Sequence, residues 1–285
     1  MTTLNRFSGG GLARRIRVGI GGWTYAPWRN NFYPEGLVQR RELEYASGRL
    51  ATIEINGTYY RAQKPAVYAS WRAQTPDGFV FSLKAPRAIV QRRVLAEAEA
   101  AIRAFVFGGL AELDDRLGPI NWQLPPERLF DADDLDAFLA LLPRRVDGLP
   151  LRHALEVRHP SFLCGEFLGL VRRHGVAAVF TDSDEYPSFA DLGGDFVYAR
   201  LKRSRSDIAT GYAPEALGAW AARARRWAEG AEPADLPRIA AAEAADAGPR
   251  DVFLYFIGAA KERNPAAAIA LQERLPWSAP AEDIF

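Results

Sequence analysis

The segment "TIEINGTYYR" (Thr52–Arg61) shows how the chain folds. Ile53 and Ile55 mark a short buried strand, and Glu54 stands between them. Successive side chains of a strand point to opposite faces, so the isoleucines share one face and Glu54 occupies the other. Carboxylates are rarely fully buried unless they are paired. We therefore expect the second face of this strand to border a polar interior.

Short apolar segments of this kind occur eight times, separated by stretches with helical spacing. They begin at Ile16, Ala51, Phe79, Gly118, Ala154, Val176, Phe196 and Val252. Alternating strands and helices indicate parallel β-α units, and eight units form a (β/α)8 barrel. We predict an α/β protein with one TIM-type barrel domain. A doubly wound sheet is the alternative, but "GIGGW" (Gly19–Trp23) lacks the glycine pattern of a dinucleotide-binding turn.

The predicted domain limits follow from composition. The barrel covers residues 16–275, after a flexible leader at 1–15 and before a C-terminal tail at 276–285. Helices are expected at 39–50, 65–74, 94–113, 131–142 and 214–230, with a last helix from Pro265. Residues 231–250 are rich in Ala, Pro and charge without periodicity, which predicts a surface excursion before the last strand.

Composition excludes several classes of protein. The net charge of the 285 residues is +1, so no overall field attracts nucleic acid or membranes. The single cysteine, Cys164, excludes an internal disulfide framework and zinc sites built from paired cysteines. The sequence contains neither a secretory signal nor an apolar run of about 20 residues, the length of a membrane span. We expect a soluble, cytoplasmic protein without a membrane partner.

Polar side chains recur at the inward positions of the predicted strands. The same alternation turns further polar side chains toward the barrel axis, late on their strands: Asn56, Lys84, Gln123, Glu156, Arg158, Arg200 and Lys202. Active sites of TIM barrels lie at the C-terminal ends of the strands. Charges buried there must pair with one another or bind a ligand. A closed ion-pair network and a ligand pocket are both compatible with this pattern.

Six motifs in order resemble the YecE-like family, also called domain of unknown function 72. They cover Gly19–Pro34, Glu54–Arg61, Phe79–Ile89, Leu117–Pro126, Glu156–Phe162 and Thr181–Pro187. The resemblance implies a TIM-type barrel and no established activity. Two segments depart from the family's commoner pattern, at 202–212 and 257–264. Both lie at the expected ligand end of the barrel, which suggests a variant ligand.

Candidate site residues fall into two groups by chemistry. Acid-base catalysis could use Glu54, Glu156, Asp182 and His159. The ligand-binding candidates are Trp23, Tyr25, Asn56, Tyr60, Lys84, Arg87, Gln123, Arg158, Arg200 and Lys202. Arginine and lysine donors gathered in a concave site recognise phosphate or carboxylate groups. The four acid-base residues would also suit a divalent metal, but the sequence requires no cofactor and we assign no metal ligand.

Three functions remain open from the sequence. The first is a barrel that binds a small anionic ligand, with acid-base catalysis by Glu54 and Glu156 of a hydrolase, lyase or isomerase kind. The second is a nucleic-acid-binding or processing barrel, with phosphates on a basic rim and bases on loop aromatics. The third is a non-catalytic binding protein with a structural ion-pair network along the axis.

Overall fold

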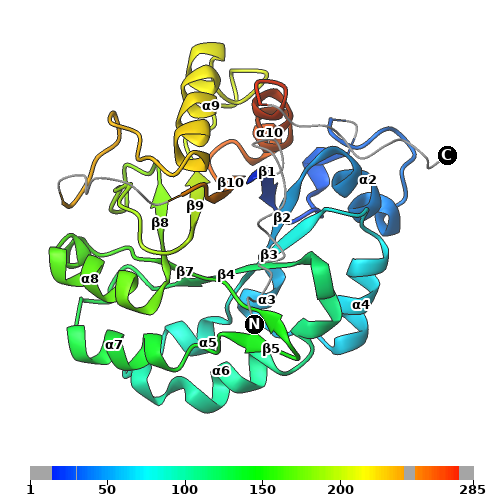
Figure 1. Cartoon of the computed structure of the whole chain (residues 1–285). Coiled ribbons are helices and arrows are strands. Elements are labelled where there is room, and N and C mark those ends of the chain that lie inside the picture. Colours follow the sequence, from blue (N-terminus) through cyan, green and yellow to red (C-terminus); the bar gives the residue numbers. More distant parts are fainter. Residues whose placement is uncertain (1–14, 30, 241–247, 276–285) are drawn as a thin grey trace.

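Eight parallel strands close into a barrel in the computed structural model, which describes residues 15–29, 31–240 and 248–275. The order around the barrel is β1-β10-β9-β8-β7-β4-β3-β2 (Figure 1). The strands are β1 (Ile16–Gly21), β2 (Thr52–Ile55), β3 (Val80–Lys84), β4 (Leu117–Gln123), β7 (His153–Glu156), β8 (Ala177–Thr181), β9 (Phe196–Leu201) and β10 (Asp251–Phe256). All eight predicted strands and the predicted fold are confirmed. Apart from Arg15, the predicted leader and tail lie outside the described residues.

Helices surround this barrel (Figure 1). The α-helices are α2 (Glu42–Arg49), α3 (Gly57–Tyr60), α4 (Pro65–Ala73), α5 (Arg87–Val90), α6 (Glu99–Val106), α7 (Ala132–Ala140), α8 (Gly165–His174), α9 (Pro214–Ala228) and α10 (Asn264–Gln272). The 3-10 helices are η1 (Ala26–Trp28), η2 (Gln39–Arg41), η3 (Leu95–Ala98), η4 (Leu110–Arg116), η5 (Pro160–Phe162) and η6 (Lys261–Arg263). In the part of the chain that the structure describes, no helix combines the length and apolar character needed to cross a bilayer.

One predicted helix is wrong in extent. The segment 94–113 is not a single helix, because η3, α6 and η4 are separate and the chain turns at Gly109, whose φ is +130°. Such a φ strongly favours glycine. The other predicted helices are present, and the Asp131 side chain caps α7 by accepting a hydrogen bond from Asp134 N at 3.0 Å.

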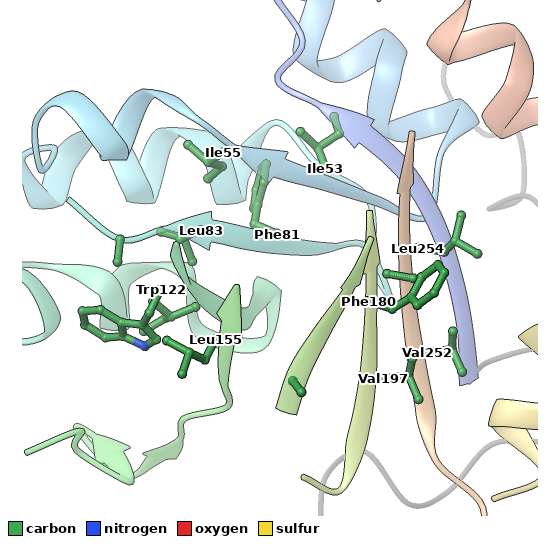
Figure 2. Close-up of a cluster of buried hydrophobic side chains, with 14 of the residues drawn as sticks. Ile53, Ile55, Phe81, Leu83, Trp122, Leu155, Phe180, Val197, Val252 and Leu254 are labelled. Atoms are coloured by element: carbon green, nitrogen blue, oxygen red, sulfur yellow. The ribbon is translucent and has the colours of Figure 1, made fainter. Parts of the chain in front are cut away.

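Two sets of side chains fill the two sides of the sheet. The outward side chains, among them Ile53, Phe81 and Leu254, are buried between the strands and the helices (Figure 2). The inward set begins near the N-terminal ends of the strands with an apolar layer that includes Val80 and Phe253. Burial of both apolar sets stabilises the barrel. The inward positions nearer the C-terminal ends are left for polar groups.

A different segment takes the place of a helix between β8 and β9. This connection, residues 182–195, contains no helix, so the expected alternation fails here. The described part of the excursion, 231–240, packs against it instead. Pro237 O accepts a hydrogen bond from Ala190 N at 2.8 Å, and the Asp191 carboxylate accepts one from Ile239 N at 2.8 Å. Excursion residues 241–247 lie outside the described residues.

A short antiparallel hairpin precedes β7 and is absent from the sequence-based prediction. It consists of β5 (Arg145–Val146) and β6 (Leu149–Pro150). Asp147 and Gly148 form its turn with φ of +44° and +82°. An Asp-Gly pair is a strong sequence signal for such a turn, so this hairpin was predictable.

Candidate functional site

The centre of the site is a buried arginine between two buried glutamates. Arg200 lies on β9, whereas Glu54 and Glu156 lie near the ends of β2 and β7. Arg200 Nη2 and Nε donate to Glu54 Oε1 and Oε2 at 3.0 and 3.1 Å, and Nη1 donates to Glu156 Oε2 at 2.6 Å. All three side chains are buried. Burial lowers the arginine pKa, but the two carboxylates raise it more and keep the guanidinium charged.

Hydroxyl groups extend this network toward the N-terminal end of the barrel. Tyr198 OH donates to Glu54 Oε2 at 2.5 Å and lies 2.5 Å from Ser82 Oγ. Thr52 Oγ1 lies 2.9 Å from Tyr255 OH. Burial, followed by the charge of Glu54, raises the pKa of Tyr198 well above its usual value, so this phenol remains a proton donor. Both carboxylate oxygens of Glu54 are occupied, because Oε1 accepts from Arg200 and Oε2 accepts from Arg200 and Tyr198.

Glu156 is also fully occupied. Its Oε2 accepts from Gln123 Nε2 at 2.7 Å as well as from Arg200. Its Oε1 accepts from Arg158 Nε at 3.0 Å and lies 3.5 Å from Lys202 Nζ. Burial raises the pKa of the Glu156 carboxyl, but the charges of Arg200, Arg158 and Lys202 outweigh it and hold this pKa well below its usual range.

Lys84 differs from the other cations of the site. No carboxylate in the described residues forms an ion pair with Lys84 within 4.0 Å. Instead its Nζ lies 3.9 Å from the centroid of the Tyr59 ring. Burial, and then the charge of Arg200, lower the pKa of Lys84 to about 8. We call Lys84, Arg158 and Lys202 the cationic face of the site.

Tyrosine rings line this cationic face and its rim. Tyr186, in the connection after β8, lies under both Arg158 and Lys202, at 4.4 and 4.7 Å from its ring centroid. Sequence reasoning missed Tyr186 because it lies in an irregular loop, where alternation gives no direction. Cation–π contacts of this kind are worth about 0.5–2 kcal/mol. The Tyr186 ring thus contacts two cations that also pair with Glu156, whereas the Tyr59 ring contacts Lys84.

Three predicted residues lie farther out on the rim. Arg87 lies over the Tyr60 ring at 5.6 Å, and Tyr60 is 71% exposed. Tyr25 lies under Lys261, whose Nζ is 4.4 Å from the ring centroid. All three residues lie at the C-terminal end of the barrel, and in the described part of the chain none of them forms a hydrogen bond or ion pair with the cationic face.

Asp182 and Asn56 contact the backbone near the site. The Asp182 carboxylate accepts hydrogen bonds from Lys202 N and from Tyr212 OH, the latter at 3.1 Å. Burial raises the pKa of Asp182. Asn56 Nδ2 donates to Glu54 O at 3.5 Å. Both residues thus position the ends of β2 and β9.

The structure does not bring His159 or Trp23 to the network. His159 Nδ1 caps η5 by accepting from Ser161 N at 3.2 Å. Trp23 packs against Trp71, with ring centroids 5.2 Å apart, and lines a groove of about 420 Å³ beside α2. Their predicted catalytic and ligand-binding roles gain no support from this placement.

Several hydrogen bonds join the 202–212 and 257–264 segments, among them one from Ser206 Oγ to Glu262 Oε1 at 2.6 Å. Ser204 Oγ lies 3.2 Å from Gly258 O and 3.0 Å from Asn264 Oδ1, either of which can accept its one proton. The 202–212 and 257–264 segments are thus one connected unit beside the cationic face. Among the described residues, no three His, Cys, Asp or Glu side chains gather so as to hold a metal ion.

This geometry defines a class of protein: a TIM-type barrel with a buried ion-pair network and a cationic, tyrosine-lined face at the C-terminal ends of its strands. The chain belongs to the DUF72 family, described as proteins of unknown function, whose family model matches residues 17–283. The predicted family is therefore confirmed.

Relatives of known structure and sequence agree with this membership. The chain is 30% identical to the UPF0759 protein YecE of Escherichia coli K12 over 175 residues, and this match spans 59% of each chain. A DUF72 family protein of Enterococcus faecalis superposes with a TM-score of 0.67 at 14% identity, over 95% of this chain and all of that one. One from Thermotoga maritima has a TM-score of 0.66 at 20% identity, over 91% of this chain and 97% of that one.

Proposed function

We propose that the chain binds a small anionic ligand, bearing a phosphate or carboxylate group, on the cationic face. The observation that carries this proposal is the excess of cations over carboxylates in the described network, in which Glu54 and Glu156 face four cations: Lys84, Arg158, Arg200 and Lys202. A partly buried cation without a counter-ion is costly. An anion that contacts Lys84 removes this cost and gains charge-assisted hydrogen bonds.

The contacts favour a holding role for the two glutamates. A general acid or base must be free to exchange a proton with the ligand. Glu156 is held ionised, and the oxygens of both Glu54 and Glu156 accept bonds from protein groups. We propose that they position Arg200 and the cationic face. Any acid-base step at this site is better served by Lys84, whose pKa of about 8 lies near neutrality.

A thermal-shift comparison tests the anion site. Inorganic phosphate, sulfate and small carboxylates would be compared with chloride at constant ionic strength. A ligand at ten times its Kd stabilises the folded state by about 1.4 kcal/mol. We expect this shift in the wild type and in Lys64→Met, an exposed lysine outside the site, and its loss in Lys84→Met. Equal shifts in all three proteins would contradict the proposal.

Nucleic-acid binding is the second candidate, because Tyr60 is 71% exposed beside Arg87. Exposed aromatic rings stack on unpaired bases, and neighbouring cations contact phosphates. Binding of single-stranded DNA should then weaken steeply as salt rises and should weaken in Tyr60→Ala. Absence of binding at low salt would remove this candidate.

A further inference from the structure

The distribution of lysine in this chain is uneven. Only four of its 36 basic residues are lysines, Lys64, Lys84, Lys202 and Lys261, and the rest are arginines. Three of the four lie at the C-terminal end of the barrel, with Nζ 3.9, 4.7 and 4.4 Å from a tyrosine ring centroid. Arginine cannot lose its proton in a protein, whereas lysine can. Three of the four lysines thus lie at the end of the barrel where TIM barrels have their active sites, and there an amine can exchange a proton or react as a nucleophile.

Among these lysines, Lys84 has the surroundings of a nucleophile. The charges facing it are Arg200 and Arg158, which disfavour its ammonium form, and Glu54 and Glu156, which favour it. With burial, the balance lowers its pKa to about 8, so about a tenth of the amine is neutral at pH 7. Lys202, by contrast, lies 3.5 Å from Glu156.

The partner of the Lys84 ammonium is a ring, not a carboxylate. The contact with Tyr59 holds the side chain in place but stabilises the charged form less than a buried carboxylate would. Asn121 is the β-sheet neighbour of Lys84. Its Oδ1 is buried and accepts no hydrogen bond from any group in the described ranges. An acceptor for a hydroxyl group is thus available on the residue that pairs with Lys84 in the sheet.

We propose that Lys84 forms an imine with a carbonyl compound that carries a carboxylate or phosphate group. This rests on the proposed function, because Arg158 and Lys202 would hold the anionic group while the amine reacts. The neutral amine adds to the carbonyl carbon, and Asn121 Oδ1 would accept from the hydroxyl of the resulting carbinolamine. Both amine protons leave with the carbonyl oxygen as water, and a C=N bond forms. The step needs no oxidant or reductant.

Reductive trapping tests the proposal on the full-length protein. The protein would be incubated at pH 7 with glyoxylate or glycolaldehyde phosphate, which carry a carboxylate and a phosphate, and with neutral propanal. Cyanoborohydride would reduce any imine to a stable secondary amine, and peptide mass spectrometry would locate it. Because the chain has only four lysines, Lys64 serves as the internal reference.

We expect both anionic aldehydes to label Lys84 at least tenfold faster than Lys64. Its neutral fraction at pH 7 exceeds that of an ordinary lysine by about two orders of magnitude. Inorganic phosphate should slow this labelling, and propanal should label Lys84 more slowly. Labelling at equal rates on all lysines would overturn the imine proposal.

The remaining outcomes separate this proposal from the proposed function. Phosphate-dependent stabilisation without labelling of Lys84 would leave the anion site and overturn the imine. Fast labelling of Lys84 by propanal, without competition by phosphate, would overturn both the anion site and the substrate class proposed here. In Lys84→Arg the label should disappear from this position, while Lys64 should be labelled at its wild-type rate.

Discussion

Glu54 and Lys84 lie near the ends of neighbouring strands, yet their surroundings give them different roles. Glu54 is fully buried and shares Arg200 with Glu156. The Lys84 ammonium contacts a tyrosine ring, whereas the Glu54 carboxylate contacts an arginine. Removing one partner of a buried ion pair leaves an uncompensated charge, whereas removing an unpaired buried charge does not.

The two substitutions should therefore change stability in opposite ways. Glu54→Gln is expected to lower the free energy of unfolding by about 3–5 kcal/mol. Lys84→Met is expected to leave the free energy of unfolding unchanged or to raise it at pH 7. Urea unfolding of both variants and of Lys64→Met would measure the difference. Equal destabilisation by Glu54→Gln and Lys84→Met would show that Lys84 belongs to the structural network.

The pH dependence of stability tests the Lys84 environment separately. Its pKa is about 8 in the folded protein and about 10.5 in an unfolded chain, so the unfolded state binds more protons between these values. Wild-type stability should then rise with pH from 8 to 10.5, relative to Lys84→Met, by about 3 kcal/mol. Unfolding curves of the two proteins across this range would give the difference. A difference that does not change with pH would contradict the burial of this amine.

Alternation along the strands predicted which side chains face the axis. It correctly turned Gln123 and Arg200 toward the axis, where both donate to Glu156. It could not predict how these groups pair, since pairing depends on distances between strands far apart in the sequence. Nor could it find Tyr186, because a residue in an irregular loop has no periodic neighbours that fix its direction.

At the scale of elements, a buried histidine joins β4 to β7. Trp122 Nε1 donates to His153 Nδ1 at 3.0 Å, and His153 Nε2 lies 2.7 Å from Pro143 O. Only a neutral ring protonated on Nε2 can satisfy both contacts. Burial lowers the pKa of His153 to about 4, which keeps the ring in this form.

As the pH falls, the stabilisation that depends on neutral His153 should be lost before most carboxylates become protonated. An unfolded histidine takes up a proton near pH 6.5, whereas folded His153 does so near pH 4. The stabilisation is complete above pH 6.5 and is lost as the pH falls toward 4, with a total of about 3 kcal/mol. In His153→Gln, the free energy of unfolding should change less with pH over this range than in the wild type. In the control His159→Gln, it should change as much as in the wild type. Equal slopes in the wild type and His153→Gln would contradict the assignment.

The sequence predicted elements well where they were regular. The break at Gly109 and the hairpin at Asp147–Gly148 were marked by glycine and could have been predicted. The missing helix after β8 could not, because its replacement by residues 231–240 depends on contacts formed only in the folded protein, such as Ala190 N with Pro237 O.

For the whole molecule, the site is a local charge excess in a nearly neutral protein. The net charge is only +1, so the anion binding that we propose would depend on the cationic face and not on an overall field. Because Lys84 loses its charge near pH 8, the affinity for phosphate should fall as the pH rises above this value. Titration calorimetry at pH 7 and pH 9.5 would measure this loss, which should be smaller in Lys84→Arg. Unchanged affinity in the wild type would contradict a role for Lys84.

The most direct test of the anion site is a crystal soaked in selenate, a phosphate-like anion with a strong anomalous signal. We expect an anomalous peak in contact with Lys84 Nζ and at least one of Arg158 and Lys202. Selenate bound elsewhere on the protein, with only water at the cationic face, would contradict the proposed anion site.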